Sequence, residues 1–294
     1  MAKKAAKKAI KQKIELVNTE CSIHVDEEPV KEEQKVPVPV VSVNYFGRYG
    51  NNLFQYVAAR LFAEKNGYKM LVSPPSGFLT AKDHPESTIT DEDLKPYGRC
   101  LVNIFDPVVK DQATIFWFNS YFQDSKHFNP YRAQIKEMFD LKPIQKNTED
   151  IVVHLRLTDY FWSRNKWVIS PLWYIQLIKK EKYRNCYIVV EPHVTNKEYL
   201  KYFDNIKNVK IVTGNTAAED FEFIRSFDRI ICSNSTFCWW AAFLSDASKI
   251  YTFKPWIRDP KVNLADIPNG KAVPGEFFRI KKLENLDWTD YWKK

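Results

Sequence analysis

The 294-residue sequence is short of the features that define several classes of protein. Its 8 glycines are too few for a loop-dominated or collagen-like chain, and no apolar run approaches the roughly 18 residues of a membrane-spanning helix. Its 5 cysteines form an odd set without a CxxC pair, which is typical of reduced thiols rather than of a disulfide framework. The N-terminus is basic but no apolar segment follows it, so we expect no secretory signal, no membrane anchor and a cytoplasmic protein.

The charges of the sequence indicate an anionic partner. Lys and Arg number 44 against 36 Asp and Glu, which gives a net charge of +8. Residues 1–38 form a charged tail that predicts disorder, and a solvated charge run explains its lysines better than a helix on an anionic surface. The remainder is mildly basic, which suits a phosphate-bearing ligand. Because the signatures of nucleic-acid-binding folds are missing, we expect no nucleic-acid partner.

The first half of the globular chain, residues 39–145, predicts an α/β domain. An apolar run at 40–46 is typical of a buried strand, and a glycine-containing break at 47–52 separates it from a segment with helical periodicity. A short strand at 69–73 and a closing helix at 135–141 complete the prediction for this half.

The second half, residues 146–294, is more regular. Continuously apolar runs alternate with helical stretches of about ten residues, which predicts a parallel, doubly wound sheet. The predicted strands lie at 150–156, 186–192, 209–214, 228–235 and 249–255, and the predicted helices lie near 171–181, 195–204, 218–227 and 236–245. Ligands of such sheets bind beyond the carboxyl ends of the strands, so polar residues there are the first candidates for a site.

A first polar cluster joins the opening strand to its helix. It reads Gly47-Arg48-Tyr49-Gly50-Asn51. Glycines at such a junction let the backbone approach a ligand, and the N–H groups of the following helix attract an anion. A simple tight turn is the alternative. The cluster matches neither GxGxxG nor GxxxxGK[ST], so the dinucleotide and Walker fingerprints do not apply.

A second polar cluster ends the first strand of the second half. Alternation along the strand puts His154 and Arg156 on one face and Leu155 and Leu157 on the other. Two groups that can carry positive charge suit a diphosphate, and arginine grips phosphate oxygens in a bidentate manner. The alternative is that Arg156 pairs with Asp159 only to fasten the loop.

A third polar cluster, Ser233-Asn234-Ser235-Thr236-Phe237-Cys238, lies where a strand turns into a helix. Ser, Asn and Thr cap helix starts well, which is the simple explanation, but the same hydroxyls and N–H groups can hold a phosphate. The tryptophans that follow, Trp239 and Trp240, are typical of a buried core rather than of a stacking platform.

Four segments together resemble the α-1,2-fucosyltransferases of glycosyltransferase family 11. GRYGNNLFQY resembles the opening motif of that family, and YFQDSKHF resembles its Tyr-Trp-Gln-Ser-Glu-Lys-Tyr-Phe stretch. HLRLTDY resembles its His-x-Arg-Arg-Gly-Asp-Tyr motif, and SNSTFCWWAAFLS its Ser-Asn-Ser-Thr-Phe-Ser-Trp-Trp-Ala-Ala segment. The four occur in the order of the family and span about residues 40–255.

The resemblance implies a fold and a reaction. The fold is GT-B-like: two Rossmann-like α/β domains face a cleft, with 39–145 on the acceptor side and 146–294, which includes a terminal helix, binding the donor. The reaction is an inverting transfer of fucose from GDP-fucose to a glycan hydroxyl, on a galactoside in α-1,2 linkage. Another nucleotide sugar, or a nucleotide-sugar-binding module without turnover, are the alternatives.

The resemblance also assigns roles to residues. Arg156 would hold the donor phosphates and His154 would lie beside the donor. The other implied donor-binding residues are Gly47, Arg48, Gly50, Asn51, Asp220, Asn234, Ser235, Thr236 and Phe237, with Asp220 touching guanine or ribose. Asp159 is the nearest candidate for the general base, and its competing role is to orient Arg156.

Two features qualify these assignments. Leu157 and Thr158 stand where the family has arginine and glycine, and Asn52 stands where it has glutamine. The string Asp91-Glu92-Asp93 has the form of a metal-binding DxD motif, but a capped, acidic helix start explains it better. We therefore expect no metal cofactor, and Arg156 with helix-terminal N–H groups to stabilise the leaving diphosphate instead.

Overall fold

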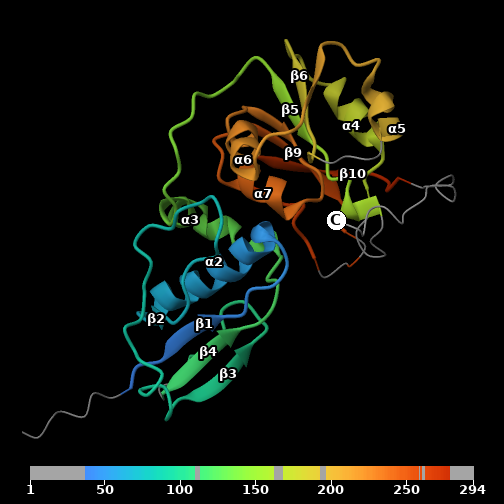
Figure 1. Ribbon diagram of the computed structural model, residues 1–294. Coiled ribbons are helices and arrows are strands. Elements are labelled where there is room, and N and C mark those ends of the chain that lie inside the picture. The colour runs from blue at the N-terminus through green and yellow to red at the C-terminus, as the bar shows by residue number, and fades with distance from the viewer. Residues whose placement is uncertain are drawn as a thin grey trace, which may run out of the picture. The chain divides into compact units, whose positions relative to one another are not determined.

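The computed structural model describes residues 37–109, 113–161, 168–192, 197–257, 259 and 262–278 (Figure 1). The predicted terminal helix, and the predicted tail as far as residue 36, lie outside the described residues. Both sheets of the described chain belong to the unit that begins at Pro37.

The first sheet has four parallel strands in the order β2-β1-β4-β3. They are β1 (Val40–Val43), β2 (Lys69–Met70), β3 (Gly98–Val102) and β4 (Thr114–Phe118). Helix α2 (Tyr49–Asn66) packs against β1 on one side and against helix α7 (Thr236–Phe243) on the other. A helix enclosed in this way is apolar around most of its circumference. It ends at Gly67, which adopts a left-handed conformation with a φ of 68°.

The second sheet has six parallel strands in the order β10-β9-β8-β5-β6-β7. They are β5 (Ile151–His154), β6 (Cys186–Val189), β7 (Val209–Val212), β8 (Arg229–Ile231), β9 (Lys249–Lys254) and β10 (Gly270–Pro274). Counted from β5, this is the 3-2-1-4-5-6 order of the Rossmann fold, in which the chain reverses direction across the sheet between the first and fourth strands. The predicted doubly wound sheet is confirmed, and its switch point lies between β5 and β8.

Helices cover both faces of the second sheet. They are α4 (Pro171–Ile178), α5 (Lys197–Leu200) with η4 (Lys201–Phe203), α6 (Ala217–Arg225) and α7. Val152 of β5 packs in the core that includes α6 and α7, while Ile151 and Val153 pack in the core that includes α4. Leu155 and Leu157 continue the α4 side, so His154 and Arg156 share the other face, as the alternation predicts.

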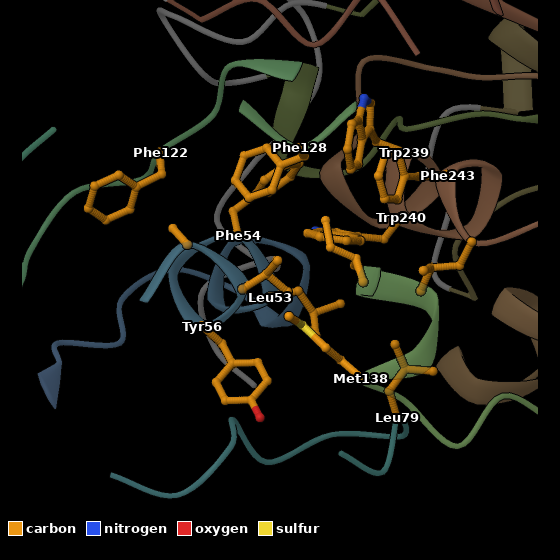
Figure 2. Close-up of a cluster of buried hydrophobic side chains, with 14 of the residues drawn as sticks. Leu53, Phe54, Tyr56, Leu79, Phe122, Phe128, Met138, Trp239, Trp240 and Phe243 are labelled. Carbon is orange, nitrogen blue, oxygen red and sulfur yellow. The ribbon is translucent and has the colours of Figure 1, made fainter. Parts of the chain in front are cut away.

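The predicted burial of the paired tryptophans is confirmed. Trp239 and Trp240 are both 0% exposed, and Figure 2 shows them beside Phe54 and Phe128. The Trp240 indole N–H donates to the carbonyl of Gly50 at 3.0 Å. Buried aromatic packing and this hydrogen bond join the starts of α7 and α2, which carry two of the polar clusters.

Several elements differ from the sequence predictions. β3 was not predicted, because it is an edge strand whose Leu101 is 61% exposed, and β10 was not predicted, because it is another polar edge strand. β4 was not predicted either, and its short apolar run alone does not distinguish a buried strand from a helix. The helix predicted at 135–141 is right only as far as Glu137, because α3 spans Arg132–Glu137 and residues 138–141 are not helical. The short helices η1 (Ser125–His127) and η2 (Asn129–Tyr131) precede it.

The helix predicted to begin at Asp91-Glu92-Asp93 is wrong, because residues 91–96 form turns. Thr90 and Asp93 instead fasten the turn to each other: the backbone N–H of Thr90 donates to the Asp93 carboxylate at 3.0 Å, and that of Asp93 to the Thr90 hydroxyl at 3.3 Å. Among the described residues, no group of three or more His, Cys, Asp or Glu side chains could hold a metal ion.

The cysteines within the described ranges are free thiols: Cys100, Cys186, Cys232 and Cys238. No helix of the described chain combines the length and apolar character needed to cross a membrane.

Candidate functional site

A pocket of about 490 Å³ opens at the switch point of the second sheet. Its walls come from the carboxyl ends of β5, β6 and β7 and from the starts of α2, α6 and α7. The lining residues are Arg48, Tyr49, Gly50, Asn51, Phe78, His154, Arg156, Tyr160, Val190, Glu191, Pro192, Asn215, Ala217, Asp220, Ser235, Thr236 and Phe237. The structure therefore brings all three polar clusters of the sequence to one cavity.

Arg156 lies at the centre of a chain of alternating charges. Its guanidinium contacts Asp159 at 2.5 Å on one side and Glu191 on the other. Asp159 in turn contacts Arg48 at 2.5 Å. The Arg156 side chain is only 11% exposed and lies over the Tyr160 ring, with 5.3 Å from the guanidinium carbon to the ring centre. An arginine has five N–H donors, so two carboxylate partners fix its plane without using its full hydrogen-bonding capacity.

His154 lies in the pocket wall as a neutral imidazole. The residue is 4% exposed, and its Nδ1 lies 2.7 Å from the Ser233 hydroxyl. Burial lowers the pKa of His154 to about 4, against a smaller opposing effect of Glu191. Of the two groups on this face that can carry a positive charge, Arg156 therefore carries one at neutral pH and His154 does not.

Acidification is expected to destabilise the protein through His154. Its pKa is near 6.5 in an unfolded chain and about 4 in the folded one, so the unfolded state binds the proton first as the pH falls from 6.5 towards 4. Between pH 7 and pH 5 the loss from this group amounts to about 2 kcal/mol in the free energy of unfolding. Urea unfolding at both pH values should show a clearly smaller loss in a His154→Gln variant, and an equal loss would exclude His154 as the cause.

The starts of α2 and α7 meet at Gly50. A Cβ placed on Gly50 would lie 2.9 Å from the backbone nitrogen of Phe237 and 2.7 Å from the Thr236 hydroxyl. The Thr236 hydroxyl donates to the Asn51 side chain at 3.1 Å, and Gln123 donates to the same Asn51 oxygen at 2.9 Å. Only glycine permits this approach of two helix N-termini, both of which border the pocket.

The N-terminus of α7 offers backbone N–H groups to the pocket. Ser235 occupies the N-cap position, but within the described residues its side chain makes no capping hydrogen bond. The simple explanation of the third cluster, a conventional side-chain cap, is therefore not what the structure shows. Uncapped N–H groups at a helix start, together with the helix dipole, favour an anion at this end.

Gly50→Ala is expected to destabilise the protein by about 1–3 kcal/mol, because the methyl group overlaps the backbone of α7. Gly98→Ala is the matched control, since a Cβ at Gly98 meets only the Ala113 carbonyl, at 3.8 Å. Urea unfolding of the two variants measures the difference. Equal stability would show that α2 and α7 do not approach as described.

Asp220 lines the pocket on the side of α6. Its carboxylate accepts a hydrogen bond from the Asn215 side chain at 3.0 Å, and the residue is 8% exposed. Burial raises the pKa of Asp220, an effect that the Asn215 hydrogen bond opposes. A recessed carboxylate beside an amide can accept and donate hydrogen bonds along the edge of a flat polar ring.

Most of the predicted site residues line the pocket, and three do not. Asp159 does not line the pocket, and its two carboxylate oxygens form ion pairs with Arg48 and Arg156. This geometry favours its orienting role, while its action as a base stays a prediction. Gly47, with a φ of 83°, and Asn234, whose carbonyl accepts from Tyr160 at 2.9 Å, neighbour the lining residues.

Several lining residues were not predicted from the sequence. Glu191 lies near the end of the strand predicted at 186–192, and Asn215 directly follows the strand predicted at 209–214. The rule that ligands bind beyond strand ends points to both places, but it assigns a role to neither residue. Tyr160 belongs to the second cluster but was given no role. Phe78 lies in an irregular segment that carries no periodic signal.

Leu157 and Thr158, which stand where the resembled motif has arginine and glycine, each have a place in the structure that suits them. Leu157 is 1% exposed in the core on the α4 side of the sheet, a place that suits an apolar residue. The Thr158 hydroxyl donates to the Glu191 carboxylate at 2.9 Å. Both residues thus support the turn that carries Arg156.

A Rossmann-ordered sheet with an arginine and a helix N-terminus at its switch point is typical of the class of proteins that bind nucleotides and other anionic ligands. Comparison with known proteins makes this specific. Residues 117–264, about half of the chain, match glycosyl transferase family 11, and the chain belongs to this family. The matched range includes the second and third clusters but not the first, at 47–51.

The chain is also similar to an individual protein. The chain is 25% identical over 186 residues to an alpha-1,2-colitosyltransferase of Escherichia coli. The match covers 56% of this chain and 62% of that protein, which is less than two thirds of the relative's length.

Proposed function

We propose that the protein transfers fucose from GDP-fucose to a hydroxyl of a glycan acceptor, a galactoside, in α-1,2 linkage. The observation that carries the proposal is the fixed Arg156 guanidinium, which lines the pocket at the switch point beside the N-terminus of α7. Family membership supports a nucleotide-sugar donor and a glycan acceptor. The cytoplasmic location stays a prediction.

In this proposal Arg156 stabilises the leaving group. Negative charge grows on the diphosphate as the bond to the sugar breaks, and a positioned cation in a recessed site stabilises that charge without reorganisation. The charge chain that includes Asp159 and Glu191 holds the guanidinium in place before the donor arrives. The N–H groups at the start of α7 supply further donors to the phosphates.

The nucleoside occupies the part of the pocket lined by Asp220. Guanine presents an N1–H and a 2-amino group, both donors, on its Watson–Crick edge. The Asp220 carboxylate accepts from such groups, and Phe237 and Phe78, whose ring centres are 6.0 Å apart, supply apolar surface beside it. We assign Asp220 to guanine rather than to the ribose on this basis.

The acceptor approaches from the first sheet. We propose the GT-B arrangement, with 39–145 as the acceptor-side domain and 146–294 as the donor-binding domain. Arg48 and Asn51 of the first half and Arg156 of the second line one pocket, which supports this division of roles. The transfer inverts the anomeric carbon, and Asp159 is the proposed base once donor binding releases it from Arg156.

A second candidate keeps the mechanism and changes the sugar. The Escherichia coli relative is an alpha-1,2-colitosyltransferase. Colitose in place of fucose would use the same diphosphate and guanine contacts, so the two candidates differ only in the part of the site that touches the sugar.

The experiment that tests the proposal incubates the purified protein with GDP-fucose, GDP-colitose or UDP-galactose and a panel of galactosides. The products are identified by mass spectrometry and their linkage by NMR. We expect an α-1,2-fucosylated product that forms equally well with and without EDTA, because we propose no metal. GDP binding without any product would favour the non-catalytic module, and loss of product in EDTA would contradict the metal-independent mechanism.

A further inference from the structure

The carboxylate of Glu191 holds the turn that carries Arg156. Glu191 lies two residues beyond the end of β6, which pairs in parallel with β5, and the strand end brings it opposite the turn that follows β5. Its Oε2 accepts from the backbone N–H of Leu157 at 3.0 Å and from that of Thr158 at 3.3 Å. Its Oε1 accepts from the Thr158 hydroxyl at 2.9 Å and contacts the Arg156 guanidinium.

These contacts connect Glu191 to the turn rather than to the open part of the pocket. Both oxygens are engaged, and the side chain is only 16% exposed. The same contacts fix the backbone that follows Arg156 and one edge of its guanidinium.

We infer that Glu191 is a positioning residue of the donor site, which fixes Arg156 and its turn in the geometry that receives the diphosphate. The inference rests on the proposed function. It also accounts for Thr158, because a glycine at this position would lack the hydroxyl that donates to Glu191.

Two opposite effects follow from changing Glu191, and the choice of variants separates them. Removing its charge lessens repulsion of the diphosphate, while removing its hydrogen bonds loosens the turn. Glu191→Gln and Glu191→Ala both remove the charge, but only glutamine keeps a side-chain oxygen that can accept from Leu157 and Thr158. The difference between the two variants therefore reports the positioning effect alone.

The test measures GDP binding to the full chain by isothermal titration calorimetry and thermal stability by circular dichroism. We expect Glu191→Ala to bind GDP at least tenfold more weakly than Glu191→Gln. Glu181→Ala is the matched control: Glu181 is a buried, ion-paired carboxylate, 5% exposed, that contacts Lys249 and Tyr251 away from the pocket. The Glu181→Ala variant should have a lower melting temperature and an unchanged affinity for GDP.

Three results would overturn the inference. The first is equal GDP affinity of the alanine and glutamine variants of a protein that binds GDP, which would leave the proposed donor intact. The second is a loss of affinity in Glu181→Ala that matches the loss in Glu191→Ala, which would reduce the effect to general destabilisation. The third is failure of the unchanged protein to bind GDP, which would overturn the proposed donor as well.

Discussion

Arg156→Ala is expected to lower the rate of sugar transfer about 10²–10³-fold, equivalent to about 2.7–4 kcal/mol in the activation barrier. The side chain lines the pocket and its guanidinium is fixed by Asp159 and Glu191. It is the best-placed cation to stabilise charge on a leaving diphosphate. Measurement of kcat and KM with GDP-fucose reports the effect, and kcat should fall more than donor affinity, because the charge is largest in the transition state.

A second buried arginine provides the control for Arg156. Arg225 is 4% exposed, contacts Glu222 at 2.5 Å and donates to the carbonyl of Lys142. Both Arg225→Ala and Arg156→Ala remove a buried, ion-paired arginine and should lower the stability of the protein. Arg225→Ala should leave kcat unchanged. An Arg156→Ala variant that folds and transfers at the original rate would exclude the proposed role.

Asp220→Ala is expected to reduce the preference for GDP over UDP and ADP about 10–100-fold, since a well-formed set of hydrogen bonds to a base edge contributes about 1–3 kcal/mol of discrimination. Asp220 is recessed in the pocket with Asn215 as its neighbour. Uracil and adenine do not present the two adjacent donors of guanine, so they lose less when the carboxylate is removed. Competition calorimetry with the three diphosphates measures the preference.

The control for Asp220 is its neighbour in the sequence. Glu219 belongs to the capping box of α6, where its carboxylate accepts from the Thr216 N–H at 2.8 Å, and glutamine can fill the same role. Glu219→Gln should leave the nucleotide preference unchanged. If Asp220→Ala kept the full preference for GDP, the nucleoside would have to lie elsewhere in the pocket.

The second sheet and its site could be predicted well from the sequence. Long apolar runs alternating with helices, as at β5 and β6, carry a strong signal. The rule for strand ends then pointed to His154, to Arg156 and to the cluster after β8, of which Ser235, Thr236 and Phe237 line the pocket. The alternation that put Leu155 and Leu157 on the opposite face is likewise a local property of an extended chain.

The features of the site that could not be predicted depend on contacts between distant parts of the chain. Gly50 packs against Thr236, which lies 186 residues later in the sequence, and no local sequence pattern encodes this contact. The neutral state of His154 follows from burial by residues of other elements. Glu191 was missed because a single carboxylate after a strand has no motif, and its contacts with the Arg156 turn become visible only when β6 lies beside β5.

A structure of the protein crystallised with GDP tests the central claim most directly. The account predicts that the diphosphate lies within hydrogen-bonding distance of the Arg156 guanidinium and of the N–H groups at the start of α7, with guanine against Asp220. A diphosphate bound away from the carboxyl end of β5, or one bridged by a divalent cation in place of Arg156, would contradict it.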